Sequence, residues 1–510
     1  MQKILQKIEA LSCQKLHWWI IALSILIAAQ VQYIQHGWIN PDSVLYLESA
    51  KAFSQGAWQT GIDVMPWPLY ALCIAFVSKI TTFNVHLSAQ ILNVIFFAIA
   101  TYSFINIIQL AGGKQRQIIA GALIWLSAQY MIGGVLEMLM RDEGFWAFYL
   151  LGLVFFIRFY QKQQIKDALL WQACIIIAIL FRIEAILNLL FLPFILLFLT
   201  QNTWQQKITL FVKAHAINMA LAVIIMGIFL TNDALSTKLL GRLNEIFTTD
   251  LWQQFTRLLN EKSQIMSADV LGKYLEEFAA PGLLLTFLYV ICVKTIGATG
   301  LINIGLAGFL VKNKRLIENK SYQVLCAAAA IALLNMALII TKVFVLSSRY
   351  VMGLSFILMV FAAFYLADFL FKNHTNTKSK WLAAGLVIIM LGGAIKNLVP
   401  KKAGYNFQQD AVAWVNANNK DKKAVFYDEA RMRYYANDVF ITPWADNWLH
   451  TLSFIKNNQM NQFDYLLINF TSKQASQKLF IKQQLAEYDN VANFYDAKQK
   501  KHTAIFVKKN

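Results

Sequence analysis

The chain has 510 residues, of which 58% are hydrophobic and only 15% are charged, whereas soluble proteins carry about 25% charged residues. This composition excludes an ordinary soluble enzyme and a disordered chain. The net charge of +18 is gathered in short connectors between apolar runs, which is typical of cytoplasmic loops and does not indicate nucleic-acid binding. We therefore predict an α-helical polytopic membrane protein whose surroundings are membrane lipids, with no nucleic-acid partner.

Apolar runs long enough to cross a bilayer recur through the first 400 residues. A helix needs about 20 residues to cross the hydrocarbon layer. Eleven candidate spans follow in chain order: 18–35, 86–110, 117–136, 143–160, 168–182, 185–200, 209–230, 297–311, 322–345, 350–371 and 381–398.

The distribution of Lys and Arg predicts which side of the membrane each connector faces. Six connectors carry two to four basic residues each and alternate with turns that hold Arg141, Arg182 and Arg349. Because short basic loops stay in the cytoplasm, we predict a cytoplasmic N-terminus. An odd number of spans then puts the C-terminal end on the opposite side, together with the three arginines.

The loop 36–85 is predicted to lie on the outer side. Within it, 41–58 has the pattern of a surface helix, with Asn40 as its cap and Pro41 at its first position. The run 66–82 is apolar but short and contains two prolines, so we predict that it lies in the interface.

A second outer loop is predicted at 231–296, where charged residues are frequent and the pattern is helical. The apolar stretch 282–295 at its end either lies in the interface or extends the next span.

From residue 399 the composition becomes polar, which predicts a separate C-terminal α/β domain over 399–510, following a membrane module over 1–398. A helix is predicted at 407–418, and short strands at 425–427, 439–442, 465–469 and 504–507.

Cofactor signatures are scarce. The five cysteines form no C-x-x-C pair and the seven histidines are scattered, so no zinc motif is present. No glycine-rich phosphate loop occurs, which argues against a nucleotide donor. We expect that no cofactor is required, and a divalent metal remains an open alternative.

Acidic residues at the predicted outer face are the first candidates for chemistry. Asp42 begins the surface helix, where it would also suit the positive helix end. Asp142 and Glu143 follow Arg141 at the start of a span, where they either cap the helix or line the mouth of a cavity, since ionised groups in membranes often mark sites. The residues alone leave both roles open.

Basic residues at three outer turns are the second group of candidates. Arg182 and Glu184 are two positions apart, so they would pair only across an irregular turn. Arg349 and Lys342 either extend toward the interface or, with Arg182, converge on one anion. Arginine suits phosphate because its planar guanidinium donates two hydrogen bonds at once.

Taken in order, these motifs resemble the GT-C superfamily of glycosyltransferases, as in bacterial aminoarabinose transferases and protein O-mannosyltransferases. The matching pieces are Asn40-Pro41-Asp42-Ser43, the small-residue stretch Ala50–Gly56, Pro66-Trp67-Pro68, Arg141-Asp142-Glu143, Phe181-Arg182-Ile183-Glu184, Ser348-Arg349-Tyr350 and the mixed C-terminal domain. No piece is specific alone, but their order is characteristic and covers nearly the whole chain.

The resemblance implies transfer of a sugar from undecaprenyl phosphate or another polyprenyl phosphate, with inversion, at the periplasmic face of a bacterial inner membrane. It implies that Asp42 is the base and that Asp142, beside Glu143, orients the acceptor or the sugar. Arg182 and Arg349 would bind the phosphate, within a substrate site that also includes Arg141, Glu184, Lys342 and Tyr350. Ser43 follows Asp42 and no Asp-x-Asp is present, which favours the metal-free version of the reaction.

Two other functions fit the same charges. A transporter or flippase for an anionic lipid or metabolite would use the cations as a binding path, and an assembly factor would use the outer domain to recruit a partner. For a transferase, the acceptor remains open among a lipid such as lipid A, a surface protein and a glycan.

Overall fold

The computed structural model describes residues 12–34, 39–199, 201–221, 223, 251–272, 274–310, 319–371, 377–399, 406–437, 448–471, 481 and 483–509. The chain is mostly helical and divides into two compact units. Unit 1 comprises Met1–Ala28, Val94–Val135 and Arg141–Asn397, and unit 2 comprises Ala29–Asn93, Leu136–Met140 and Leu398–Asn510. One boundary between the units falls between Asn397 and Leu398, and the predicted domains 1–398 and 399–510 stay a prediction.

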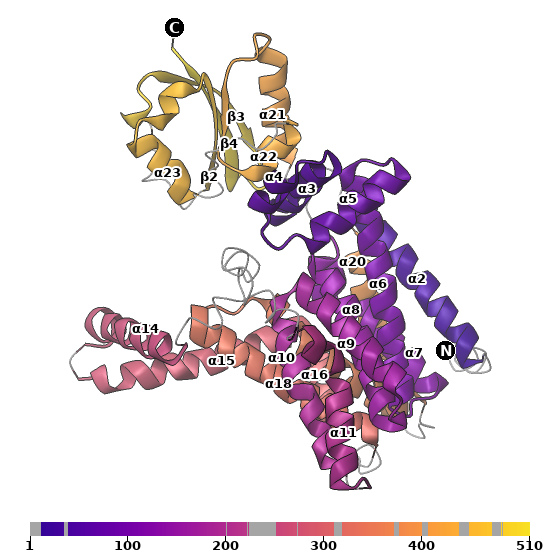
Figure 1. Cartoon of the computed structure of the whole chain (residues 1–510). Helices are drawn as coiled ribbons and strands as arrows, with labels where there is room; N and C mark the ends of the chain where they lie inside the picture. Colours follow the sequence, from indigo (N-terminus) through magenta and orange to yellow (C-terminus); the bar gives the residue numbers. More distant parts are fainter. Residues whose placement is uncertain are drawn as a thin grey trace. The chain divides into compact units, whose positions relative to one another are not determined.

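In the described part of the chain, eight helical segments are long and apolar enough to cross a membrane (Figure 1). The helices are α2 (Cys13–Ile34), α6 (Val85–Leu110), α7 (Gln115–Ser127, continued by the π-helical turn Met131–Val135), α8 (Asp142–Lys162), α15 (Ala279–Thr299), α18 (Lys320–Val343), α19 (Met352–Phe371) and α20 (Thr377–Asn397). The prediction of a polytopic α-helical membrane fold is thereby confirmed.

The span predicted at 168–182 is a helix that is slightly too short to count as membrane-length, and the span predicted at 185–200 is broken. Helix α9 (Ile165–Phe181) has 17 residues. The next segment consists of a 3-10 turn (Ile183–Ala185), the short helix α10 (Ile186–Phe191) and a second 3-10 stretch (Leu192–Phe198). Pro193 lies in the first turn of that last stretch, where its missing N–H prevents a regular α-helix from continuing.

The segment predicted at 209–230 begins with α11 (Trp204–Ala214), and most of its second half lies outside the described residues. The predicted start of the span 297–311 is wrong. Helix α15 already begins at Ala279, and Gly300, with a φ of 88°, separates it from the shorter α16 (Leu301–Leu310). Glycine accepts this backbone conformation without a steric penalty, so 282–295 belongs to a membrane-length helix of its own.

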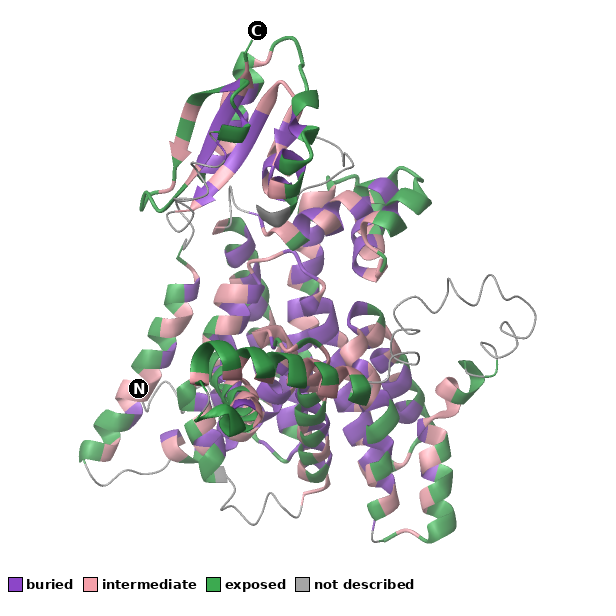
Figure 2. Cartoon of the chain, turned by 90° about the vertical axis from the view of Figure 1, so that its left-hand side faces the viewer, coloured by how far each residue is buried: buried purple, intermediate pink, exposed green. Residues whose placement is uncertain are grey.

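Burial distinguishes inner membrane helices from outer ones (Figure 2). In the most apolar 18-residue stretch of α8, 78% of the residues are buried. In the corresponding stretches of the segments that contain α15 and α20, only 11% are buried. Exposed leucines and isoleucines along α20 include Leu382, Ile388 and Ile395. We infer that lipid covers these outer faces, because exposed apolar surface of this extent is unfavourable in water.

Unit 2 contains the three helices of the predicted outer loop: α3 (Pro41–Ser54), α4 (Trp58–Val64) and α5 (Leu69–Thr81). The predicted helix start at Pro41 is confirmed, but the helix ends at Ser54 and more than half of its residues are buried, so it is not an exposed surface helix. Helix α5, with 13 residues, is too short to cross a membrane. Asn40 occupies the N-cap position but its side chain makes no cap hydrogen bond. Its amide Nδ2 contacts Sδ of Met140 at 3.4 Å instead.

The linker Leu136–Met140 is held in unit 2 by side-chain amides. Gln32 donates to the carbonyl of Leu136, and Asn93 donates to the carbonyl of Met138 at 3.0 Å. Asn93 in turn accepts a hydrogen bond from Tyr70 at 2.7 Å. The backbone that leads into Arg141-Asp142-Glu143 therefore has fixed partners.

The C-terminal part of unit 2 is a four-stranded sheet of order β1-β2-β4-β3. Its strands are β1 (Val425–Tyr427), β2 (Tyr465–Thr471), β3 (Tyr488–Tyr495) and β4 (Lys501–Lys508). β1 is parallel to β2, and the other pairs are antiparallel, with Leu467 opposite Ile505. A β-bulge between Asn490 and Ala492 shifts the register of β3.

Helices cover both faces of this sheet. Leu467 and Ile505 pack against α21 (Asn406–Asn418), while Leu466 and Ile468 face the opposite core with Phe454 of α23 (Trp448–Lys456). Helix α22 (Ala430–Tyr435) follows β1. The prediction of a mixed α/β region is confirmed, with the expected helix and three of the four expected strands, and the strand expected at 439–442 lies outside the described residues.

Strand β3 was not predicted. Its residues are mostly exposed, because it forms one edge of the sheet, so its sequence lacks the apolar alternation of a half-buried strand.

One described helix of the second predicted outer loop is α14 (Leu251–Met266), which lies in unit 1.

Candidate functional site

The charged cluster of unit 1 is built where α8 begins and α9 ends. Asp142 and Glu143 occupy the first turn of α8, and Arg182 follows the last residue of α9. Gly144 permits the close approach of the two helices, because a Cβ atom at that position would overlap the ring of Phe181. Phe181 precedes Arg182, so this contact also brings the guanidinium toward Asp142.

Arg182 is the centre of a buried ion-pair network. Its Nη1 bonds Oδ1 of Asp142, and its Nη2 lies 2.9 Å from Oε1 of Glu184. The side chain of Arg182 is 3% exposed and that of Asp142 is 1% exposed. The predicted pairing of Arg182 with Glu184 is confirmed, and the irregular turn it required is the extended backbone of Arg182, with φ −148° and ψ 123°.

Aromatic rings flank these charges. The guanidinium carbon of Arg182 lies 4.7 Å from the ring centre of Tyr350, and that of Arg349 lies 6.0 Å from the same ring. The ring of Tyr350 thus contacts two cations, and both distances are within cation–π range. Cation–π contact favours a fixed guanidinium orientation, which hydrogen bonding to an oxyanion also requires.

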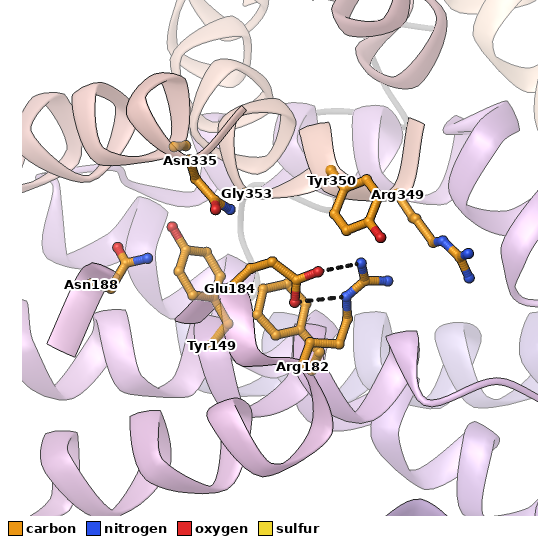
Figure 3. A pocket seen from close by; sticks show the side chains of 10 residues that line it. Tyr149, Arg182, Glu184, Asn188, Asn335, Arg349, Tyr350 and Gly353 are labelled. Carbon is orange, nitrogen blue, oxygen red and sulfur yellow. Dashed lines mark hydrogen bonds and ion pairs between the residues drawn. The ribbon is translucent and has the colours of Figure 1, made fainter. Parts of the chain in front are cut away.

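A small pocket opens beside this network (Figure 3). It has a volume of about 20 Å³, and Arg182, Glu184, Arg349 and Tyr350 contribute to its lining. Three further polar residues, Tyr149, Asn188 and Asn335, line it as well. None of these three was predicted from the sequence, although polar residues inside apolar spans are a known signal for membrane sites.

Several buried polar atoms around the network have no hydrogen-bond partner among the described residues. They are Oδ2 of Asp142, both carboxylate oxygens of Glu143, the hydroxyl of Tyr149 and Oδ1 of Asn188. Buried polar groups are nearly always hydrogen-bonded. A polar ligand or water would satisfy these groups, so the cluster has unused capacity for binding.

Three predicted binding residues, Arg141, Glu143 and Lys342, do not line the pocket, and neither does Asp142. Glu143 is fully buried. Arg141 is the N-cap residue of α8 and is half-buried, and its charge acts on Glu184. Lys342 lies in the last turn of α18 and is also half-buried.

Asp42 belongs to unit 2, where it is an exposed residue in the first turn of α3. Ser43, the next residue, is fully buried. Because Asp42 is exposed, its side chain is accessible to a substrate. Because Ser43 is buried, the helix backbone next to Asp42 is fixed by packing.

Within the ranges that the structure describes, no three His, Cys, Asp or Glu side chains converge on a point where a metal ion would bind.

The chain shares its fold with solved structures of ArnT. The chain superposes on the crystal structure of ArnT from Cupriavidus metallidurans bound to undecaprenyl phosphate, with a TM-score of 0.54 and 12% sequence identity, over 97% of this chain and 98% of ArnT. The apo state of the same ArnT gives a TM-score of 0.50 at 12% identity, over 95% and 97% of the two chains.

The mycobacterial arabinofuranosyltransferase AftD aligns with a TM-score of 0.48 at 12% identity, over 96% of this chain and 41% of that chain. No family model matches the sequence. No curated protein matches it either.

Proposed function

We propose that this protein is an inverting glycosyltransferase that moves a sugar from a polyprenyl phosphate, such as undecaprenyl phosphate, to an acceptor hydroxyl at the periplasmic face of the inner membrane. The observation that carries this proposal is the full-length likeness in fold to ArnT, solved with undecaprenyl phosphate. The charged pocket of unit 1 supports it, because its arginines, carboxylates and amides suit a phosphorylated sugar.

In this proposal Asp42 is the general base. It accepts the proton of the acceptor hydroxyl as that oxygen attacks the anomeric carbon and the bond from this carbon to the phosphate oxygen breaks. The polyprenyl phosphate leaves with the bonding electrons. Such a proton transfer contributes about 10²- to 10⁴-fold to a rate. The exposed position of Asp42 at the start of α3 is compatible with this role.

Arg349 and Arg182 are proposed to stabilise the charge on the leaving phosphate. Fixed cations in a dry site stabilise such charge more strongly than water does. The pocket volume of about 20 Å³ holds about one water molecule, so a phosphate group would lie at its mouth. At the mouth of the pocket, the half-buried Arg349 is the direct partner of the phosphate. Arg182 contributes less to stabilising the phosphate, because Asp142 and Glu184 offset its positive charge.

The deciding experiment measures sugar transfer by the purified full-length protein, supplied with labelled polyprenyl phosphate sugars and envelope extracts as acceptors. We expect Asp42→Asn to lower the transfer rate at least 100-fold, because an amide cannot accept the proton. The matched control is Asp63→Asn, since Asp63 is an exposed carboxylate on α4 of the same unit. Chelation of divalent metals should leave the rate unchanged.

Full transfer by a folded Asp42→Asn protein would exclude Asp42 as the base. Translocation of the labelled lipid without a new glycosidic bond, in the wild type, would replace the transferase with a transporter.

A further inference from the structure

A second, larger cavity lies within unit 2, with a volume of about 520 Å³. It is lined by residues of α3, α4, the end of α5 and the start of α6, by Tyr434 of α22, and by Asn437. This volume is within the range of about 300 to 1,000 Å³ typical of small-ligand sites. None of the residues assigned above to glycosyl transfer lines it.

Two polar pairs contribute to its wall, the first through Glu48 alone and the second through both of its residues. Oε1 of Glu48 on α3 lies 2.9 Å from Nη2 of Arg433 on α22, and both side chains are mostly buried. Nδ1 of His86 lies 2.8 Å from the hydroxyl of Tyr434. Burial raises the pKa of Tyr434 to about 12, so its phenol stays uncharged at physiological pH. The negative charge of Glu48 is matched by Arg433, which leaves this part of the wall polar and neutral.

Other lining groups have hydrogen-bonding capacity to spare. The side chains of Gln55, Thr60 and Asn437 make no hydrogen bond with any described residue, and Nδ2 of Asn84 makes none either. They alternate with small apolar groups such as Ala52 and Ala57. Amides, hydroxyls and one phenol beside apolar patches are the groups that bind a ligand covered with hydroxyls and C–H faces. A lipid chain would leave these polar groups unpaired, at a free-energy cost.

We infer that this cavity binds an uncharged saccharide, as the part of a glycan acceptor remote from the reacting hydroxyl. The acceptor role rests on the proposed function, whereas saccharide binding does not. Among the described lining residues, the exposed Lys51 is the one charged side chain that forms no ion pair with a described residue.

The cavity and Asp42 lie on different faces of α3. Lys51 is nine residues after Asp42, which corresponds to about 14 Å along the axis and about half a turn around it. Glu48 is about a third of a turn away from Asp42 by the same geometry. A saccharide in the cavity therefore contributes binding free energy at a distance, without touching the base.

The test is saturation-transfer NMR on the full-length protein in lipid nanodiscs, without maltoside detergents, whose headgroups are saccharides themselves. The probes are maltotriose, triacetylchitotriose and xylotriose. We expect saturable binding of at least one probe, and at least tenfold weaker binding by Ala57→Trp, which places an indole in the cavity. The control is Ala417→Trp, at an exposed position of α21 outside the cavity, which should bind like the wild type.

A second variant keeps the test decisive if Ala57→Trp folds poorly. Gln55→Ala combined with Asn84→Ala removes the side-chain amide of Gln55 and the unpartnered Nδ2 of Asn84, both at exposed positions, and should also weaken binding at least tenfold. The inference is overturned if no trisaccharide binds the wild type, if neither cavity variant weakens binding, or if excess inorganic phosphate displaces the saccharide.

Asp42→Asn separates this inference from the proposed function. We expect it to bind the trisaccharide with unchanged affinity while it loses transfer, and loss of saccharide binding in this variant would contradict the separation of cavity and base. Loss of transfer with no saccharide binding by the wild type would leave the proposed function standing and reject the cavity assignment. Unchanged transfer by Asp42→Asn, together with saccharide binding, would reject only the assignment of Asp42 as the base.

Discussion

At the scale of single residues, Arg182 and Arg349 differ in how they are held. Arg182 is almost fully buried and bonded to Asp142 and Glu184, whereas Arg349 is half-buried and contacts the ring of Tyr350. Removing one member of a buried pair leaves its partner's charge uncompensated, which costs about 3–5 kcal/mol. Arg182 is thus needed for the structure of the site as well as for its charge.

We predict that Arg182→Ala lowers both stability and transfer, while Arg349→Ala lowers transfer alone. For Arg182→Ala the expected loss is about 3–5 kcal/mol, seen as reduced thermal stability of the detergent-solubilised protein. For Arg349→Ala we expect a loss of transfer of about 10²-fold with stability changed by less than about 1 kcal/mol. Equal destabilisation by both variants would contradict the distinction.

At the scale of elements, the C-terminal sheet is joined by a buried polar network at the end of β1. Asp428 accepts hydrogen bonds from the backbone N–H of Asn469 at 2.6 Å and from its Nδ2 at 2.8 Å. Oδ1 of Asn469 accepts from Thr503 of β4 at 2.6 Å. Burial, and then the neighbouring Glu429, raise the pKa of Asp428 well above its usual range. These two effects outweigh the hydrogen bonds, which favour the charged form.

This raised pKa predicts a pH-dependent stability of the sheet. The contribution of Asp428 is fully present below its unfolded pKa of about 3.9 and is lost as the pH rises through its higher folded pKa. The free energy of unfolding should therefore fall as the pH is raised from the acidic range, and Asp428→Asn should reduce this dependence. Pulse proteolysis of the full chain in urea at several pH values measures it, and identical pH profiles for both proteins would refute the prediction.

At the scale of the whole molecule, membrane-length helices and a polar C-terminal sheet occur in one chain. Basic connectors predict a cytoplasmic N-terminus, and the proposed reaction requires the C-terminal sheet on the other side. Sidedness is a property of the inserted chain, because the bilayer and its charge asymmetry define the two faces.

We predict that alkaline phosphatase fused after residue 510 is active in bacterial cells, since this enzyme requires export. A fusion after residue 162, at the end of α8, should be inactive and serves as the control, because the connector there is predicted to be cytoplasmic. An inactive C-terminal fusion at normal expression would reverse the proposed orientation.

Local sequence signals determined much of the fold. Uniformly apolar runs predicted the membrane helices, and Pro41 predicted the start of α3. The alternation of apolar residues found β1, β2 and β4, whereas β3 escaped because an exposed edge strand carries no such pattern. The sequence also placed Arg182 beside Glu184 in a turn and marked Asp142 as a candidate.

Tertiary structure decided which distant side chains meet. Arg182 and Asp142 are 40 positions apart, and Glu48 and Arg433 are 385 apart. Asn40 illustrates the same limit, because its predicted role as a side-chain cap is replaced by a contact with Met140. Periodicity specifies the faces of a helix over a few turns, but the partner of a buried polar group depends on packing between elements, which no local pattern encodes.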